Sequence, residues 1–427
     1  MHLTSSHEIF QNNHLSRTSP DARSHSFSSG DTLPSGGRHH KRGGGIYHSY
    51  EFDEIEDTAA PKGYRPFYIS HYGRHGSRYH FLPYFFGTLE ANLHHADSLD
   101  NLTSDGSLLL RQVDSILVEH DEMLGNLTAR GQREHKLIAE RMGDRFPEVF
   151  NDKERNLVDA YSSIIRRCIM SMAASTATLM QCNPTLELDL HSDDRIYKYL
   201  NLGKQSRVNA KYYDPYMNEE LKKAVDWSKV AARVYKDPSR AMGDPFDLGY
   251  DIWNFWSICQ CIETVNIDIL KYMTLEELAE SYRIRSGYAY LKHIRSDVFG
   301  EKNADESAPL LRDFVTKADE ALAGNKVAAT LRYGHDATLM PLAAAMGLKD
   351  FSRTHTMNDL PADYWDLGSK IGMASNLQMV FYKNRKDDII VKFLYNEKET
   401  TAPALEPVHA GIYYRWSDVR NLFMSRL

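Results

Sequence analysis

Two short apolar runs, each ending at a glycine, are the clearest predicted strands in the chain. Residues 64–73 read YRPFYISHYG and follow Pro61 and Gly63, which mark the preceding turn. Residues 326–336 read KVAATLRYGHD, in which the β-like stretch 327–331 is ended by Gly334. Both runs place ionisable residues directly after a Tyr-Gly pair. A strand that ends in a polar loop is a place where catalytic groups gather, so both ends are candidate parts of a site.

Other strands and helices follow from the same pattern. Strands are predicted at 186–190, 377–382 and 389–395, and the polar NRKDD joins the last two as in a hairpin. A helix is predicted over 128–145 with Thr128 as its N-cap. The apolar positions expected on one face of that helix are Leu137, Ile138 and Met142, and those of a second helix are Ile169, Met172, Ala173, Thr176 and Met180.

The chain divides into three compositional regions. Residues 1–45 are rich in Ser, Gly and His and lack the apolar periodicity of a core, so they are predicted to be a disordered polar tail. Residues 197–295 carry few strand signals and many helical ones. We therefore predict an α/β domain formed by residues 46–196 and 296–427, split by a mostly helical insertion, with a cleft between the two.

Composition excludes several classes of function. Lys and Arg number 51 against 58 Asp and Glu in 427 residues, which gives a net charge of −7 and argues against nucleic acid as a partner. The longest uncharged stretch, residues 168–186, is too polar to span a membrane. No apolar core of a secretory signal is visible near the N-terminus. The four cysteines have no zinc-finger spacing, and buried free thiols are favoured over disulfides.

The densest chemical constellation is HYGRHGSR at residues 71–78. Arg74 and Arg78 bracket His75, and a planar guanidinium matches two phosphate oxygens at once. Gly73 and Gly76 would let the backbone approach a bound anion. A neutral imidazole beside such an anion could attack phosphorus and form a covalent intermediate. These residue types alone leave a surface loop with a chance Arg-His run as the alternative.

This constellation resembles the signature R-H-G-x-R-x-P of the histidine phosphatase superfamily, in its acid-phosphatase and phytase branch. Residues 74–78 match the first five positions, and His80 stands where the family has proline. Two further segments resemble the family's later motifs: Arg167 precedes Ser171 by four residues, and His335-Asp336 resembles the H-D motif. Residues 127–131 (LTARG) resemble its L-T-x-x-G helix start.

The resemblance implies both fold and roles. The implied fold is α/β, with a mostly parallel central sheet like that of phosphoglycerate mutase and an inserted α-helical domain. It assigns His75 as nucleophile and Asp336 as proton donor. The phosphate-binding residues it implies are Arg74, Arg78, Arg167 and His335. Members of the family are mostly exported, which implies a periplasmic or secreted location.

No metal or other cofactor is expected, since three guanidiniums and an imidazole supply the positive charge that metal ions supply in other phosphoryl-transfer sites. The partner is then a small phosphate ester. The overall pattern resembles the multiple inositol-polyphosphate phosphatases, although that subgroup usually carries H-A-E where this chain has His335-Asp336-Ala337. Broad-specificity acid phosphatase and phosphoglycerate-mutase-like phosphotransferase remain alternatives.

Histidines outside these motifs receive a structural interpretation. His94 and His95 are predicted to be an exposed pair and not metal ligands, because a metal site needs three or four convergent ligands.

Overall fold

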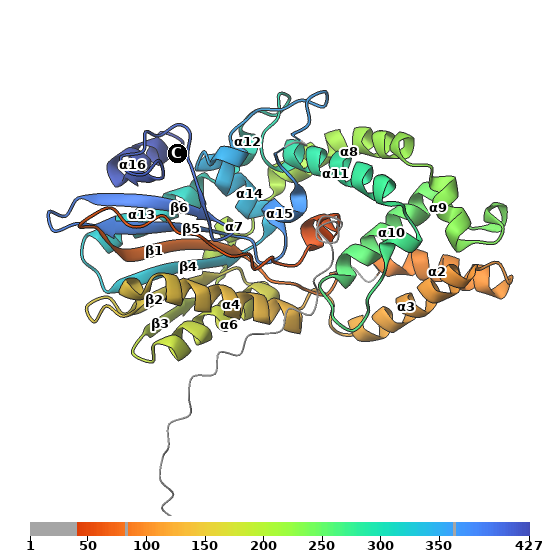
Figure 1. Cartoon of the computed structure of the whole chain (residues 1–427), viewed down its shortest axis with the longest axis horizontal. Helices are drawn as coiled ribbons and strands as arrows, with labels where there is room; N and C mark the ends of the chain where they lie inside the picture. The colour runs from red at the N-terminus through yellow and green to blue at the C-terminus, as the bar shows by residue number, and fades with distance from the viewer. Residues whose placement is uncertain (1–40, 82–83, 362–363) are drawn as a thin grey trace, which may run out of the picture.

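A twisted sheet of eight described strands forms the centre of the larger part of the molecule (Figure 1). The computed structural model describes residues 41–81, 84–361 and 364–427. The strands are β1 Arg65–Arg74, β2 Leu157–Ser162, β3 Glu187–His191, β4 Val327–Gly334, β5 Asn376–Lys383, β6 Ile389–Tyr395, β7 Lys398–Thr400 and β8 Tyr413–Arg415. Their order is β3-β2-β4-β1-β5-β6-β7, and β8 pairs with β6.

The sheet has a parallel and an antiparallel half. Strands β3, β2, β4 and β1 are parallel neighbours, whereas β5 runs antiparallel to β1 and forms a hairpin with β6. The five strands expected from apolar runs are all present; four agree with their predicted bounds within one residue, and β4 continues three residues further, to Gly334. Strand β2 was missed because Asp159 interrupts its short apolar run. The carboxylate of Asp159 is accommodated by the Tyr161 hydroxyl at 2.7 Å.

Helices cover both faces of the sheet, which gives three layers. One face packs on α4 Ala129–Arg145, α5 Pro147–Phe150 and α6 Arg166–Cys182. The other packs on α7 Asp194–Leu200, α13 Ala308–Leu322, α14 Asp336–Ala345 and α16 Trp416–Met424. Figure 1 shows α4 and α6 on one side and α14 and α16 on the other. The α/β class with a central sheet is thus confirmed.

The predicted helix faces are partly right. Thr128 does cap α4, since its hydroxyl accepts a hydrogen bond from Gly131 N at 3.2 Å. Ile138 and Met142 are buried as expected, whereas Leu137 is exposed. In α6 the expected Met180 is exposed and Leu179 takes the buried position, because the face is set by contact with α4 and the sheet.

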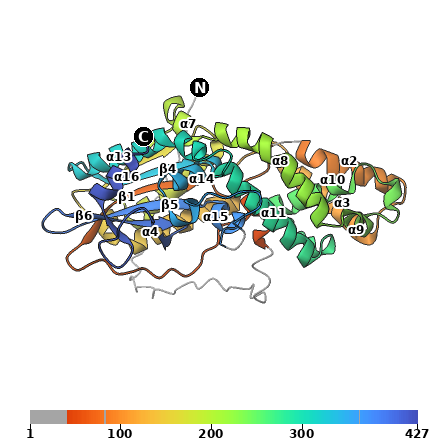
Figure 2. The same ribbon diagram turned by 90° about the horizontal axis from the view of Figure 1, so that it is seen from above.

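A second hydrophobic cluster holds together a helical lobe beside the sheet, seen in Figures 1 and 2. Its principal helices are α2 Tyr84–Ser98, α3 Ser104–His120, α8 Lys204–Ala224, α9 Trp227–Val234, α10 Pro245–Cys259 and α11 Leu275–His293. The expected insertion at 197–295 supplies four of these helices. Helices α2 and α3 come from residues placed in the α/β part by the sequence, yet they pack on α9 and α10.

Short elements complete the described chain: α12 Lys302–Glu306, α15 Leu367–Ile371 and the 3-10 turns η1 Gly45–Tyr47, η2 Pro238–Arg240, η3 Ile269–Lys271 and η4 Lys349–Phe351. None of the described helices is long and apolar enough to cross a membrane. All four cysteines are free thiols; three are buried and Cys182 is exposed.

The N-terminal boundary needs a correction. Residues 41–45 were assigned to the polar tail, but Gly43, Gly44 and Gly45 are buried. The Trp253 indole donates a hydrogen bond to the Gly43 carbonyl at 2.9 Å. A Cβ on Gly44 would approach Nε2 of the flexible Gln260 side chain to 2.2 Å, so this side chain packs directly on the segment. The remainder of the predicted tail, residues 1–40, lies outside the described residues.

Candidate active site

The candidate residues gather where the parallel strands β1, β4 and β2 end. Arg74 and Gly334 are register partners at the ends of β1 and β4. His75 N donates to the Gly334 carbonyl at 2.9 Å, and Ser163 N donates to the Tyr333 carbonyl at 3.0 Å. Carboxyl ends of parallel strands meet at one edge of a sheet and commonly bind ligands there. Segments more than 250 residues apart in the sequence therefore meet at one edge of the sheet.

His75 is presented as a neutral imidazole. Its side chain is buried, and its Nδ1 lies 2.9 Å from the Gly76 carbonyl oxygen. Because a carbonyl only accepts hydrogen bonds, Nδ1 carries the proton and Nε2 keeps its lone pair. Burial and the positive charges of Arg167 and Arg74 hold the pKa of His75 well below its usual value. An uncharged ring with a free Nε2 is the form that can attack an electrophile.

Three guanidiniums surround this ring with little negative charge to balance them. Arg74 donates from Nη1 to the carbonyls of Ile46 at 2.6 Å and Ile371 at 2.7 Å, and its Nη2 lies 3.5 Å from Asp336 Oδ2. Within the described ranges, no carboxylate pairs with Arg78 or Arg167. Burial and the Arg78 charge lower the pKa of Arg167 to about 10.

The remaining contacts of Arg78 and Arg167 orient these side chains without neutralising them. Arg78 lies over the Tyr47 ring, 5.2 Å from its centroid, and donates to the Tyr79 carbonyl at 3.0 Å. Arg167 donates to the Gly125 carbonyl at 3.4 Å. Among the described residues, the buried Nε atoms of all three arginines have no hydrogen-bond partner. Buried donors of this kind call for an acceptor, and an anion with several oxygens satisfies them best.

His335 and Asp336 enter the pocket from the start of α14. His335 Nε2 is 3.1 Å from Ser163 Oγ, and the centroids of the His335 and His75 rings are 5.6 Å apart. Burial and the Arg167 charge lower the pKa of His335 to about 3. Burial would raise the pKa of Asp336, but the charge of Arg74 and interaction with His335 outweigh it and bring the value to about 2. Without a bound anion, Asp336 is therefore ionised.

A second set of contacts holds the loop that carries His75. Ser77 donates to the buried carboxylate of Glu134 from both N and Oγ, each at 2.7 Å. Gly76 N donates to Ser171 Oγ at 3.2 Å. A Cβ on Gly76 would come within 2.5 Å of the Gly131 carbonyl, so the start of α4 packs directly on this loop. The segments 127–131 and 167–171 thus support the loop as well as form helices.

His80, which stands where the family signature has proline, is held in place by α3. His80 N donates to His120 Nε2 at 3.1 Å, a bond that the proline of the family signature could not make. The His80 ring stacks on Phe81 with centroids 5.0 Å apart. The loop therefore leaves the pocket towards the helical lobe along a path that a side chain from α3 defines.

Sequence reasoning missed three residues of this site. Ser163 contacts His335, and Glu134 supports the loop. His293 lies at the end of α11, where burial and the Lys292 charge lower its pKa to about 4 and the charge of Asp336 opposes the shift. None belongs to a short motif. Glu134 in particular lies in the charged run ARGQREHK, which is typical of a solvated helix face. The buried carboxylate of Glu397 pairs with Arg141 at 3.0 Å.

Comparison with known proteins adds a family and a set of similar folds. The family described as histidine phosphatase superfamily (branch 2) matches residues 74–396. Multiple inositol polyphosphate phosphatase 1 from Gallus gallus is 24% identical over 319 residues, which cover 65% of this chain and 65% of that protein. The match thus spans slightly less than two thirds of the curated relative.

Solved structures resemble the fold at low sequence identity. The Bifidobacterium longum multiple inositol polyphosphate phosphatase in complex with phosphate has a TM-score of 0.74 at 18% identity, covering 90% of this chain and 97% of that one. Its complex with inositol hexasulfate gives 0.72 at 17%, with the same coverage. The phytase from D. castellii gives 0.71 at 14%, covering 91% and 84%.

Proposed function

Because the chain belongs to the histidine phosphatase superfamily, branch 2, we propose that it hydrolyses phosphate monoesters through a phosphohistidine formed on His75. The observation that carries this proposal is the neutral His75 ring, with Nε2 unprotonated, among three guanidiniums that have one carboxylate between them. Such a pocket attracts a dianionic phosphoryl group and holds a nucleophile beside it.

In the first step, Arg74, Arg78, Arg167 and His335 hold the phosphoryl group. His75 Nε2 attacks phosphorus as the bond from phosphorus to the ester oxygen breaks. The leaving oxygen takes a proton from Asp336, and a positioned acid of this kind contributes about 10²–10⁴-fold. The products of the step are an alcohol and phosphohistidine.

The bound substrate itself prepares Asp336 as an acid. In the free pocket the guanidinium charges keep the pKa of this carboxyl at about 2. A phosphate dianion offsets those charges and places negative charge beside the carboxylate, so the pKa of Asp336 rises on binding. Asp336 therefore acquires its proton in the enzyme–substrate complex, most completely at acidic pH.

In the second step water attacks the phosphohistidine. Asp336, now ionised, accepts a proton from the water as the bond from nitrogen to phosphorus breaks. Inorganic phosphate leaves, and His75 returns to its neutral state. Each proton given up by Asp336 in the first step is regained in the second, so one acid serves both steps.

The proposed substrate class is the inositol polyphosphates. The relatives named above as inositol polyphosphate phosphatases and a phytase support this choice. A broad-specificity acid phosphatase would use the same groups, and a phosphotransferase would pass the phosphoryl group to a second sugar phosphate. Export from the cell, implied by the family, belongs to the same proposal.

A substrate panel at several pH values tests the assignment. Inositol hexakisphosphate is compared with sugar phosphates, phosphotyrosine and an aryl phosphate, and released phosphate is measured. We expect the highest kcat/KM on the inositol polyphosphate. Equal values on all esters would favour the broad phosphatase, and transfer to added sugar phosphate without phosphate release would favour the phosphotransferase.

A further inference from the structure

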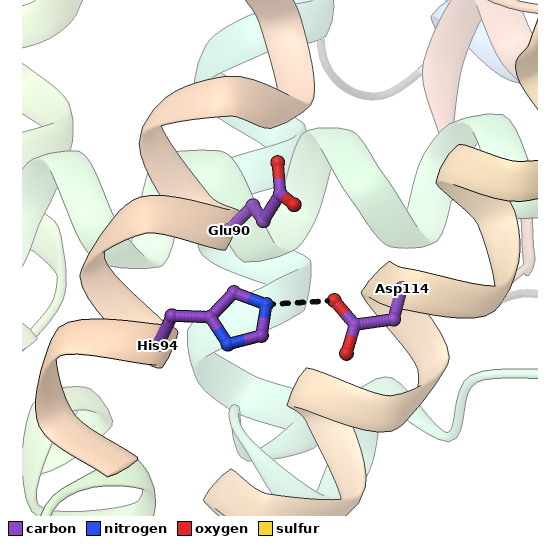
Figure 3. Close-up of side chains that lie close together, drawn as sticks. All are labelled: Glu90, His94 and Asp114. Atoms are coloured by element: carbon purple, nitrogen blue, oxygen red, sulfur yellow. Dashed lines mark hydrogen bonds and ion pairs between the residues drawn. The ribbon is translucent and has the colours of Figure 1, made fainter. Parts of the chain in front are cut away.

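Three potential metal ligands converge on the helical lobe, outside the group of residues around His75. Glu90 and His94 lie on α2, and Asp114 lies on the neighbouring α3 (Figure 3). One ligand atom from each lies within 4.8 Å of the other two, and His94 Nε2 is 3.1 Å from Asp114 Oδ1. Two of the three ligands thus come from one helix and the third, Asp114, from its neighbour.

The two helices that carry these side chains pack into the core of the lobe. Glu90 and His94 are four residues apart and share one face of α2. On the other side of the two helices, Leu93 and Val113 are fully buried in the lobe core. Ligands on packed helices lose little freedom on binding an ion, which favours affinity.

The charges of this cluster are unbalanced. Two carboxylates face one imidazole, so the group is negative even when His94 is protonated. Within the described part of the chain, the Glu90 carboxylate makes no hydrogen bond or ion pair, and the Asp114 carboxylate pairs only with His94. A divalent cation would neutralise both carboxylates.

A second His-and-carboxylate group serves as an internal comparison. Asp159, Asp189 and His191 also converge, but Lys317 Nζ lies 3.2 Å from Asp159, which also accepts the Tyr161 hydroxyl. An ammonium already compensates that group and would repel a metal ion. The cluster on α2 and α3 has no such competitor among the described residues.

We propose that Glu90, His94 and Asp114 bind a divalent transition-metal ion, with Zn²⁺ as the best match. Zinc takes imidazole nitrogen and carboxylate oxygen at about 2.0–2.2 Å, and four ligands at these lengths lie about 3.3 Å from one another. The distance between His94 Nε2 and Asp114 Oδ1 already meets this requirement. Rotation of the Glu90 side chain would bring its carboxylate oxygen to the same distance from both. Water fills the fourth position.

The ion would join α2 to α3, and α3 also contacts the segment that follows His75. Near the end of α3, Glu119 accepts the Tyr79 hydroxyl at 3.2 Å and His120 accepts His80 N at 3.1 Å. The site thus stabilises the lobe from outside the pocket, and its metal takes no part in phosphoryl transfer. The proposal does not depend on the proposed function.

Metal binding by the chelator-stripped full chain is the test. Zn²⁺ is titrated by competition with a chromogenic chelator, and the melting temperature is recorded with and without Zn²⁺. The variants His94→Gln and Glu90→Gln remove one ligand each. Two variants serve as controls. His95→Gln removes the exposed histidine next to His94, and His191→Gln removes the histidine of the group formed with Asp159 and Asp189.

We expect the wild type and both control variants to bind one Zn²⁺ that raises the melting temperature. Loss of outer-shell partners of metal ligands costs about 10–100-fold in affinity, so loss of a ligand should cost more than about 100-fold. Both the binding and the shift should disappear in His94→Gln and Glu90→Gln. Equal affinities in wild type and His94→Gln, or a loss confined to His191→Gln, would overturn the proposal. These readouts use no substrate, so they stay separate from any failure of the proposed function.

Discussion

Two groups of charged side chains lie on the α/β part of the molecule and are built in opposite ways. In the network between the N-terminal segment, α4 and β6, every cation has a carboxylate: Arg141 pairs with Glu397 at 3.0 Å, Arg145 with Asp57 at 2.8 Å, and Lys392 with Asp57 at 3.1 Å. Around His75, three guanidiniums have a single carboxylate among them, that of Asp336. This carboxylate forms an ion pair with Arg74 only.

The difference separates structural from functional charge. A buried ion offsets its desolvation only when partners satisfy it, so the paired network is compatible with stability alone. An excess of buried cations destabilises the empty protein, and it persists where a ligand supplies the missing charge. Substitutions in the two groups should therefore affect activity and stability in opposite ways.

The largest effect is expected from His75→Ala. Loss of the nucleophile should lower kcat by more than about 10⁴-fold, while the circular dichroism spectrum stays unchanged because His75 lies in a loop after β1. Acid-quenched protein incubated with ³²P-labelled substrate should carry phosphohistidine in the parent alone. A folded variant with normal turnover would exclude the mechanism.

Asp336→Asn should follow, with a loss that depends on the leaving group. An inositol alkoxide needs a proton, so turnover should fall about 10²–10⁴-fold. A nitrophenolate leaves unaided, so single-turnover cleavage of p-nitrophenyl phosphate should fall far less and show a burst before dephosphorylation stalls. Equal single-turnover losses on both substrates would contradict the acid role of Asp336.

A matched pair of arginine variants tests the comparison directly. Arg167→Met should lower kcat/KM by about 10²–10³-fold, as loss of one transition-state donor typically does, and leave the melting temperature equal or higher because Arg78 no longer faces a like charge. Arg141→Met should leave kcat/KM unchanged. The buried Glu397 carboxylate then keeps the Tyr50 hydroxyl at 2.9 Å and the more distant Arg145 at 3.8 Å, and loss of its closest cation should cost about 1–3 kcal/mol of unfolding free energy. If both variants lost kcat/KM and stability to the same extent, the distinction between structural and functional charge would be wrong.

The pH dependence of the unfolding free energy should show a smaller effect, which comes from the buried histidines His71 and His135. Burial lowers the pKa of His71 and of His135 to about 3. The unfolded chain takes up these protons near pH 6.5, so stability is lost as pH falls from about 6.5 to about 3. His135→Gln should reduce the slope of unfolding free energy by about 1.4 kcal/mol per pH unit between about pH 5.5 and 4. Denaturant titrations measure this slope, with the exposed His95→Gln as control; an unchanged slope would contradict it.

The smallest effect on turnover is expected from chelators. The positive charge in the pocket comes from side chains, so EDTA should leave kcat within about twofold, even if it removes an ion from α2 and α3 and lowers the melting temperature. A loss above tenfold, restored by a divalent ion, would show that the reaction itself uses a metal.

Much of the site was accessible to sequence reasoning because its residues sit in short motifs. Arg74, His75 and Arg78 lie within five positions, and His335 and Asp336 are adjacent, so residue type and spacing carry their chemistry. Glu134, Ser163 and His293 have no such local context. Each takes its place through packing between elements that are distant in the chain, and the charged run around Glu134 is typical of a solvated helix face.

The chain by itself determined the alternation of strands and helices, the end of β1 and β4 in polar loops, and the residue types that suit a phosphoryl group, because these depend on neighbours within a few positions. Only the tertiary structure decided which nitrogen of His75 keeps its lone pair, how low the pKa of Asp336 lies before substrate binds, and that Asp114 joins Glu90 and His94. Those properties depend on burial and on charges brought within a few ångströms by non-local contacts, and such distances are not encoded in any one segment.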